Sequence, residues 1–106
     1  MFNFDSIFEN QKKFQRQLNQ NTDSQDYFNT MSLAQIAEIM ESLNETPWKP
    51  WKKQQTRDIP KLQKELADEL LFFINRCIFA GLDPQGILEL ANDKIEENYQ
   101  RQANQY

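Results

Sequence analysis

Apolar residues recur at helical spacing in four segments of the chain, and polar stretches separate these segments. The spacing predicts helices over about 6–19, from residue 33 to about 44, from Pro60 to about 79, and from Pro84 onward. No segment shows the alternation of apolar and polar residues that is typical of a β-strand. We therefore expect an all-α fold with four helices, forming a single domain over residues 1–106.

Local signals place the helix boundaries. Ser32 and Gln35 fit a capping box, in which a hydroxyl and an amide satisfy free backbone groups at a helix start. The polar stretch 19–24 before it reads as a loop. Gly81 can end the third helix in the left-handed conformation, and Asp83-Pro84 supplies an N-cap and a first-turn proline for the fourth.

The patterns also predict which faces are buried. The third helix is apolar nearly all round from Leu70 to Phe79, so we expect it to be the buried centre, with Cys77 as an inert thiol inside it. In the fourth helix we expect Ile87, Leu88, Leu90, Ala91 and Ile95 to pack inward. The second helix carries one apolar stripe, formed by Leu33, Ile36, Ile39, Met40 and Leu43.

Two pairs of carboxylates are the main candidates for chemistry. Glu38 with Glu41, and Glu65 with Asp68, are each spaced by three residues and so share a helix face, where they can hold hard divalent cations. For the first pair, which lies opposite the apolar stripe, an ordinary solvated surface is the alternative interpretation.

The pair Glu65 and Asp68 argues against an ordinary solvated surface, because it lies one turn before the buried centre of the third helix. An isolated anion there is costly, so it must be paired, hydrogen-bonded or metal-bound. A salt bridge to Lys64 or Arg76 is the structural alternative, and Glu69 is a further candidate ligand that we rank second.

Composition excludes several classes of site. The chain has no histidine and only two glycines, which rules out imidazole-dependent triads, histidine-ligated zinc and glycine-rich phosphate loops. The net charge is −4, which argues against a nucleic-acid coat, although residues 46–64 hold six cations against one anion. The chain start lacks the pattern of a signal peptide and no apolar run could span a membrane, so we expect a cytoplasmic protein.

Two cationic groups complete the candidate chemistry. The stretch 48–53 reads Trp-Lys-Pro-Trp-Lys-Lys and could meet a polyanion, although packing is the alternative role for its tryptophans. In the fourth helix, Lys94, Asn98 and Arg101 share one face and could contact phosphate and sugar oxygens. A solvated C-terminal turn favoured by the helix dipole is the alternative for these three.

Taken in order, these blocks resemble the all-α nucleoside triphosphate pyrophosphatases, specifically the dimeric dUTPases and the related tailed-phage dCTPase/dUTPase, with MazG as a more distant relative. The resemblance rests on the E-x-x-E pair at Glu38, the Trp-Lys connection, the E-x-x-D pair at Glu65, and the closing pattern of Lys94, Asn98, Arg101, Gln102 and Tyr106. Together the blocks cover residues 38–106. The chain departs from the family in ending Gln-Tyr where Gly-Tyr is usual, and in lacking the long insertion of the larger dimeric enzymes.

The resemblance implies a MazG-like four-helix bundle completed by dimerisation, and a hydrolase that cleaves between the α- and β-phosphates of dUTP, with dCTP as a further substrate. It implies two or more Mg²⁺ ions held by Glu38, Glu41, Glu65 and Asp68, with Glu38 or Glu41 acting on the attacking water. Phosphate contacts fall to Lys49, Lys52, Lys94 and Arg101. Base and sugar contacts fall to Gln15, Asn19, Trp51, Asn98 and Tyr106, although surface polarity explains Gln15 and Asn19 equally well.

Three further expectations and two alternatives follow. We expect a homodimer, because helices with apolar residues on more than one side need more cover than one short chain supplies. The Trp-Lys connection looks most like that of the phage enzyme, which implies a bacteriophage source and action in the host cytoplasm. The alternatives are a broad MazG-like pyrophosphatase and a non-catalytic helical protein that binds nucleic acid or a partner.

Overall fold

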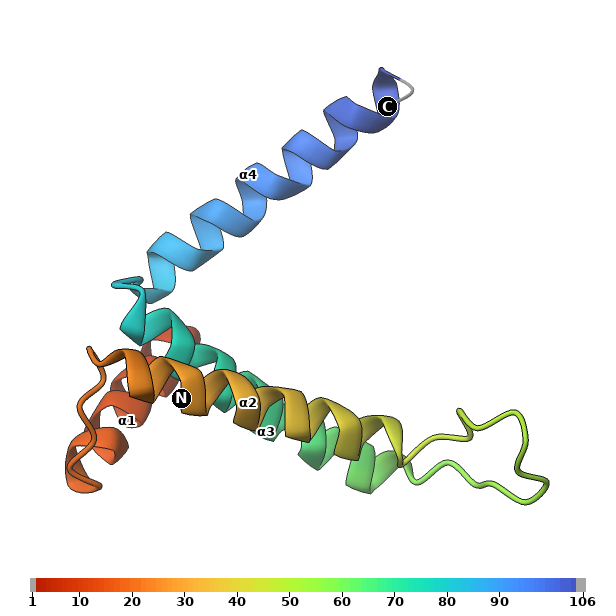
Figure 1. Ribbon diagram of the computed structural model, residues 1–106. Helices are drawn as coiled ribbons and strands as arrows, with labels where there is room; N and C mark the ends of the chain where they lie inside the picture. The colour runs from red at the N-terminus through yellow and green to blue at the C-terminus, as the bar shows by residue number, and fades with distance from the viewer. Residues whose placement is uncertain (1, 105–106) are drawn as a thin grey trace.

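The structure, a computed structural model, describes residues 2–104 and is built from four helices (Figure 1). They are α1 (Phe4–Gln17), α2 (Gln25–Leu43), α3 (Ile59–Phe79) and α4 (Pro84–Ala103). Residues 2–104 contain no strand. The expectation of an all-α fold with four helices is therefore confirmed.

Every helix begins at a polar residue whose side chain accepts a hydrogen bond from the backbone of the first turn. These N-caps are Asn3, Ser24, Asp58 and Asp83. Proline in the first turn of α3 and α4 removes a backbone donor that would have no partner there. Between these helices Gly81 has φ +78°, the left-handed conformation that ends α3 as predicted.

The predicted start of α2 is wrong by two turns. The helix begins at Gln25, because Ser24 is the N-cap and accepts a hydrogen bond from the Tyr27 backbone. The Ser32 hydroxyl and the Gln35 side-chain carbonyl instead accept hydrogen bonds from Arg76 on α3, both at 2.9 Å. A pattern that fits a helix cap therefore serves here to join α2 to α3.

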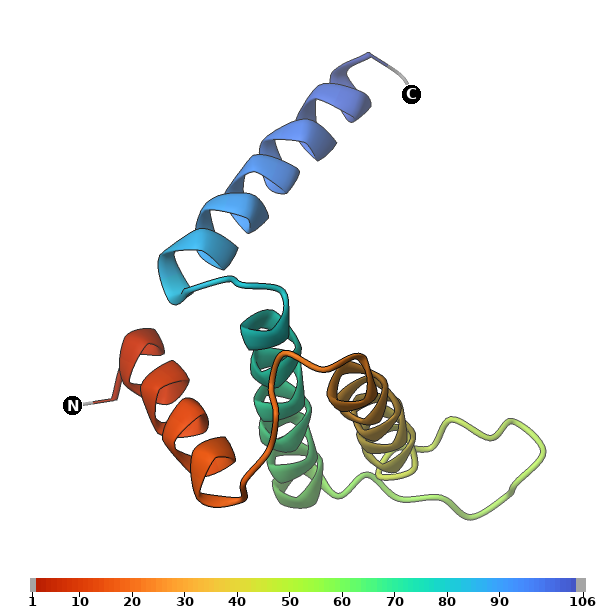
Figure 2. The same cartoon turned by 60° about the vertical axis from the view of Figure 1, so that its left-hand side comes forward.

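Helix α3 is the centre of the fold, with α1 and α2 packed along it on different sides (Figure 2). The innermost core contains Phe8 from α1 with Ile74 and Cys77 from α3. Burial raises the pKa of the Cys77 thiol above its ordinary value, as expected for an inert buried cysteine. The prediction that this part of α3 forms the buried centre is confirmed for Ile74, Asn75 and Cys77, whereas Leu70, at the start of the predicted range, is exposed.

Two apolar surfaces are left uncovered in the single chain. The α2 stripe faces solvent, with Leu33 67 % and Ile36 57 % exposed, while the opposite face of α2 packs on α3. Helix α4 projects away from the other three and buries no residue (Figure 1). The inward packing predicted for α4 is therefore wrong in one chain for Leu88, Leu90, Ala91 and Ile95, which are exposed. Of the five residues predicted, only Ile87 packs against the core.

The connection 44–58 between α2 and α3 is a long loop that extends beyond their ends (Figure 1). Its base is closed by a backbone hydrogen bond from Asp58 to Glu45 and by an ion pair of 3.2 Å between Lys61 and Glu45. Among the described residues, no helix has the length and hydrophobicity needed to cross a membrane.

Candidate metal centre

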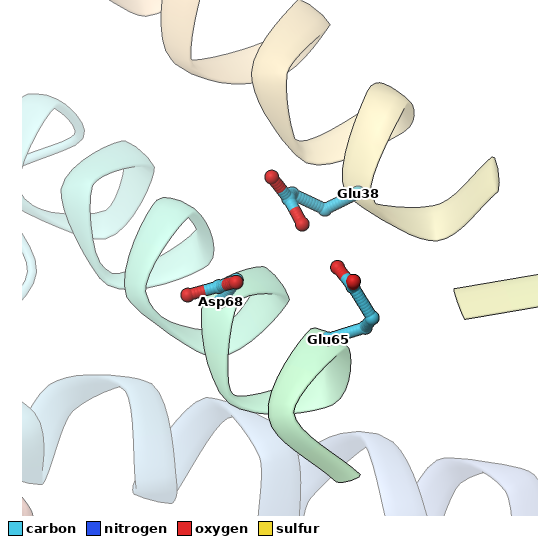
Figure 3. A group of neighbouring side chains, drawn as sticks. All are labelled: Glu38, Glu65 and Asp68. Carbon is cyan, nitrogen blue, oxygen red and sulfur yellow. The ribbon is translucent and has the colours of Figure 1, made fainter. Parts of the chain in front are cut away.

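Three of the four predicted metal ligands come together where α2 packs on α3. Glu38 from α2 and Glu65 and Asp68 from α3 each offer a carboxylate oxygen, and these oxygens lie within 4.8 Å of one another. Figure 3 shows the three side chains pointing into one shared space between the helices. The two acids on α3 meet there because their three-residue spacing puts them on one face. We call these three residues the carboxylate group.

Glu38 is the member of the carboxylate group with a buried oxygen that lacks a hydrogen-bond partner. This oxygen is its Oε2 atom. Burial, together with the nearby carboxyls of Glu65, Glu41 and Asp68, raises the pKa of Glu38 to about 7. Glu41 is exposed and lies outside the carboxylate group, and its carboxyl contributes to the raised pKa of Glu38.

Salt bridges do not account for this arrangement. Within residues 2–104, no ion pair involves Glu38, Glu65 or Asp68. Arg76, one proposed partner, bonds to Ser32 and Gln35 and lies over the Phe28 ring at 5.2 Å. Glu69, ranked second as a ligand, also has a buried oxygen without a partner.

The donor set fits a hard divalent cation. Carboxylate oxygens are the ligands that Mg²⁺ prefers, and converging anions repel one another unless a positive charge lies between them. A cation there would also satisfy the orphaned Oε2 atom of Glu38, since a buried polar atom without a partner is costly. The solvated surface that periodicity allowed for Glu38 is not what the structure shows.

A mixed cavity of about 290 Å³ lies beside the carboxylate group, between α1 and α3. Asp68 lines it and so belongs to both sites. Gln15 lines it as well and is only 4 % exposed, and its side-chain amide makes no hydrogen bond within the described part of the chain. Apolar walls come from Phe14, Leu18, Met31, Leu71 and Phe72.

The sequence pattern did not single out two further amides that line this cavity, Gln11 and Asn75. Gln11 Nε2 donates a hydrogen bond of 2.9 Å to Asn75 Oδ1, and Asn75 Nδ2 contacts the Met31 sulfur at 3.2 Å. Asn75 is 2 % exposed. The signal that could have found it is an amide inside the apolar run 70–79, because buried polar groups need partners.

The other predicted base contacts in the described range do not reach this cavity. Asn19 is exposed and follows the end of α1, and its φ is +57°. Asparagine tolerates this left-handed conformation, so the residue is explained by the turn that the chain makes after α1. Trp51 is 72 % exposed in the 44–58 loop and makes an edge contact with Trp48. Gln15 is thus the predicted base contact that the cavity contains.

The predicted phosphate-binding residues lie in two other places. Lys49 and Lys52 line a separate polar cavity of about 250 Å³ in the loop. Lys94 and Arg101 are on α4, where both form ion pairs with Glu97, at 3.0 and 2.8 Å. Asn98 is on α4 as well, while Tyr106 lies outside the described residues.

Comparison with known proteins identifies the family. A family model described as dUTPase matches residues 3–82, which is most of the chain. The chain belongs to the dUTPase family. The dUTPase match spans α1 to α3, with the carboxylate group and the cavity beside it, and ends before α4. Neither the curated proteins nor the solved structures gave a match.

Membership of this family gives the chain a dUTP-hydrolysing function in general and a nucleotide as its substrate. The sequence resemblance to all-α pyrophosphatases is thereby confirmed at the level of the family.

Proposed function

We propose that the protein is a Mg²⁺-dependent dUTP diphosphatase that converts dUTP and water into dUMP and diphosphate, and that it also accepts dCTP. The observation that carries this proposal is the convergence of Glu38, Glu65 and Asp68 between α2 and α3. The family match supports dUTP as the substrate.

The carboxylate group is the proposed binding site for Mg²⁺. Glu38, Glu65 and Asp68 hold the first ion, and Glu41, on the same face of α2 as Glu38, serves a second. When bound, Mg²⁺ would neutralise triphosphate charge and lower the pKa of a coordinated water molecule. We propose that the site binds two or more Mg²⁺ ions.

Glu38 is the proposed general base, with Glu41 as the alternative. Glu38 lies beside the space in which the ion would hold the attacking water, so it is within reach of that water. The pKa of about 7 belongs to the metal-free chain, and a bound cation would lower it, so that Glu38 would be ionised at neutral pH. One oxygen of Glu38 would bind the ion, and the other would orient or deprotonate the water.

The cavity between α1 and α3 is the proposed base site. Its volume of about 290 Å³ suits a ring between apolar walls, and its amides suit the polar edge of a pyrimidine. Gln15 has no hydrogen bond to give up when a base arrives, and Asn75 is held by Gln11. An amide can present either its carbonyl or its NH₂ group, so this site can serve both uracil and cytosine.

Helix α4 is the proposed source of further phosphate and sugar contacts from Lys94, Asn98 and Arg101. In the structure α4 projects away from the other three helices (Figure 1). The number of residues from Glu65 to the end of α3 equals the number from the start of α4 to Asn98. Each of the two residues therefore lies about 21 Å along its helix from the turn that connects α3 to α4. If α4 folds back along α3, Asn98 reaches the level of Glu65.

A homodimer is part of the proposed function. The exposed α2 residues Leu33, Ile36, Met40 and Leu43 recur at intervals of three, four and three residues, which is the spacing of a helix-packing seam. In a dimer with twofold symmetry, the apolar stripe of one chain would pack against the same stripe of the second chain. A phage origin, and action in the host cytoplasm, remain part of the proposal through the Trp-Lys connection.

The proposal is tested by measuring diphosphate release from dUTP, dCTP, dTTP and ribonucleoside triphosphates with Mg²⁺, with and without a chelator. We expect turnover of dUTP and dCTP that stops on chelation. Glu65→Gln and Asp68→Asn should each lower kcat by more than about 100-fold with unchanged helical content, because each removes a ligand charge. Glu9→Gln, on the exposed surface of α1, is the matched control and should retain activity.

The other outcomes identify the alternatives. Equal turnover of all the triphosphates would favour a broad MazG-like pyrophosphatase. No turnover, combined with nucleic-acid binding that survives chelation and weakens steeply with salt, would favour a non-catalytic protein. Full activity in both Glu65→Gln and Asp68→Asn would refute the metal assignment.

A further inference from the structure

Polar contacts join α2 to α3 at two places, and the carboxylate group lies between them. At the end next to the 44–58 loop, Glu45 accepts a backbone hydrogen bond from Asp58 and forms an ion pair with Lys61. Toward the other end, Arg76 on α3 donates hydrogen bonds to α2. The two helices run side by side in opposite directions between these contacts (Figure 1). The carboxylates therefore converge on a stretch that is held on both sides.

Arg76 contacts α2 over two helical turns. Its Nε atom donates to Ser32 Oγ and its Nη1 atom donates to Gln35 Oε1, both at 2.9 Å. Its guanidinium carbon lies 5.2 Å from the centre of the Phe28 ring, which itself packs on the Phe79 ring at 4.6 Å between centroids. Phe28, Ser32 and Gln35 are spaced by four and three residues, so they lie along one face of α2. One guanidinium group thus binds that whole face.

Neutralisation of charge does not explain an arginine at this position. Both of its acceptors are neutral side chains, and within residues 2–104 no ion pair involves Arg76. A half-buried guanidinium gains less from neutral acceptors than from a carboxylate. What arginine supplies is a rigid, planar set of donors. Two hydrogen bonds from one plane fix both the distance of α2 from α3 and the rotation of α2 about its own axis.

The rotation of α2 matters for the carboxylate group. Glu38 follows Gln35 by one turn, and Asp68 precedes Arg76 by about two turns on α3. A side chain extends roughly 5 Å from the helix axis, so a rotation of about 20° would move its end by about 2 Å. Mg²⁺ requires near-ideal octahedral geometry with ligands at about 2.1 Å. An error of this size would therefore remove Glu38 from the ligand set.

We propose that Arg76 is a positioning residue for the carboxylate group. By binding Ser32 and Gln35 it holds α2 in the rotation that turns Glu38 toward the two acids of α3, and it thereby raises the affinity of the site for small divalent cations. Arg76 is not itself a ligand of the ion. This inference rests on the proposed metal site, and it adds a residue that controls the site from about two turns away.

Arg76→Met removes both hydrogen bonds and keeps an unbranched side chain of similar length. It should weaken Mn²⁺ binding about tenfold with unchanged helical content, as measured by electron paramagnetic resonance. Arg76→Lys keeps the charge but offers a single ammonium group in place of the planar donors, so it should lose about as much. Arg16→Met removes an arginine from the exposed surface of α1 and should leave binding unchanged.

Ion size separates positioning from a general loss of stability. Mg²⁺ demands strict geometry, whereas Ca²⁺ accepts flexible coordination. In competition with Mn²⁺, Arg76→Met should therefore weaken Mg²⁺ binding about tenfold and Ca²⁺ binding less than about threefold. Gly81→Ala strains the turn after α3, where φ is +78°, and should leave both affinities unchanged. Equal losses for the two ions in Arg76→Met would mean that Arg76 only stabilises the fold, which would overturn the proposal.

The two acceptors provide a second variant that leaves Arg76 in place. Ser32→Ala combined with Gln35→Met should weaken Mn²⁺ binding as much as Arg76→Met does, because the same contact is lost. Adding Arg76→Met to this double variant should cost less than about a further twofold, since residues that act through one contact are not additive. Fully additive losses would contradict the positioning role.

Asp68→Asn distinguishes this proposal from the function proposed above, because Asp68 belongs to the carboxylate group itself. Lost Mn²⁺ binding in Asp68→Asn, with full affinity in Arg76→Met and in the acceptor variant, would overturn the positioning role and leave the metal site intact. Full affinity in Arg76→Lys would show that charge acts in place of geometry, which would also overturn it. No saturable Mn²⁺ binding by the wild type would overturn both proposals.

Discussion

Glu38 is poorly solvated in the described structure, and a bound cation would satisfy its carboxylate. It faces α3, and its buried Oε2 atom has no partner. Burial and the neighbouring carboxyls raise its pKa to about 7. The folded protein therefore holds the Glu38 proton more tightly than the unfolded chain does, and this difference has a consequence for stability.

Between about pH 4.5, the ordinary pKa of a glutamate, and about pH 7, folding takes up a proton at Glu38. The free energy of unfolding should therefore fall as pH rises through this window and level off above it. We predict that thermal unfolding in metal-free buffer shows this fall and that Glu38→Gln flattens it. Glu9→Gln should keep the wild-type slope. An unchanged slope in Glu38→Gln would show that Glu38 is not buried among acids.

Gln15 gives a second prediction at this scale, because its side-chain amide lines the cavity and makes no hydrogen bond in the described structure. Gln15→Leu should leave the unfolding temperature unchanged or raise it, since no side-chain hydrogen bond is lost and an apolar side chain is placed at a position only 4 % exposed. The same change should raise KM for dUTP about three- to tenfold through one lost hydrogen bond. Gln17→Leu, at an exposed position of α1, is the control for both measurements. A lower unfolding temperature with unchanged KM would make Gln15 structural.

At the scale of the elements, the boundary between α3 and α4 could be predicted and the start of α2 could not. Gly81 and Asp83-Pro84 act locally, and each has the predicted role. Ser24 and Ser32 both precede plausible helix starts, and the choice between them depends on Arg76, which is distant in the sequence. Local patterns do not contain that information.

Gly81 provides the prediction for this boundary. A Cβ atom at Gly81 would meet nothing within 4 Å, so any cost of substitution comes from its φ of +78°. Gly81→Ala should lower the free energy of unfolding by about 1 kcal/mol, and Gly81→Asn by less, because asparagine tolerates the left-handed conformation. Chemical denaturation of the two variants measures the difference. Equal stability of Gly81→Ala and wild type would mean that the turn does not keep this conformation.

For the whole molecule, periodicity identified the amphipathic faces but not what covers them. The carboxylates were expected to converge, and three of the four do. The stripe on α2 and the apolar residues of α4 are instead exposed, because their cover is not within the single chain. The buried amide of Asn75 was missed because most residues of the run 70–79 around it are apolar.

The uncovered stripe leads to a prediction about assembly. Ile36→Lys should convert a dimer into a monomer at micromolar concentration, because it places a charge in the proposed seam. The side chain is 57 % exposed in the single chain, so the fold itself should tolerate the change. Asn10→Lys on the exposed surface of α1 controls for added charge. Sedimentation of the wild-type protein as a monomer would contradict the dimer.

The central claim is that Glu38, Glu65 and Asp68 form a site for divalent cations, and titration with Mn²⁺ followed by electron paramagnetic resonance tests it most directly. We predict saturable binding by the wild-type protein that strengthens from pH 6 to pH 8, as the ion displaces the proton held at Glu38. Asp68→Asn should weaken this binding at least about tenfold, and Glu9→Gln should leave it unchanged. Equal Mn²⁺ affinity in the wild type and Asp68→Asn would contradict the account.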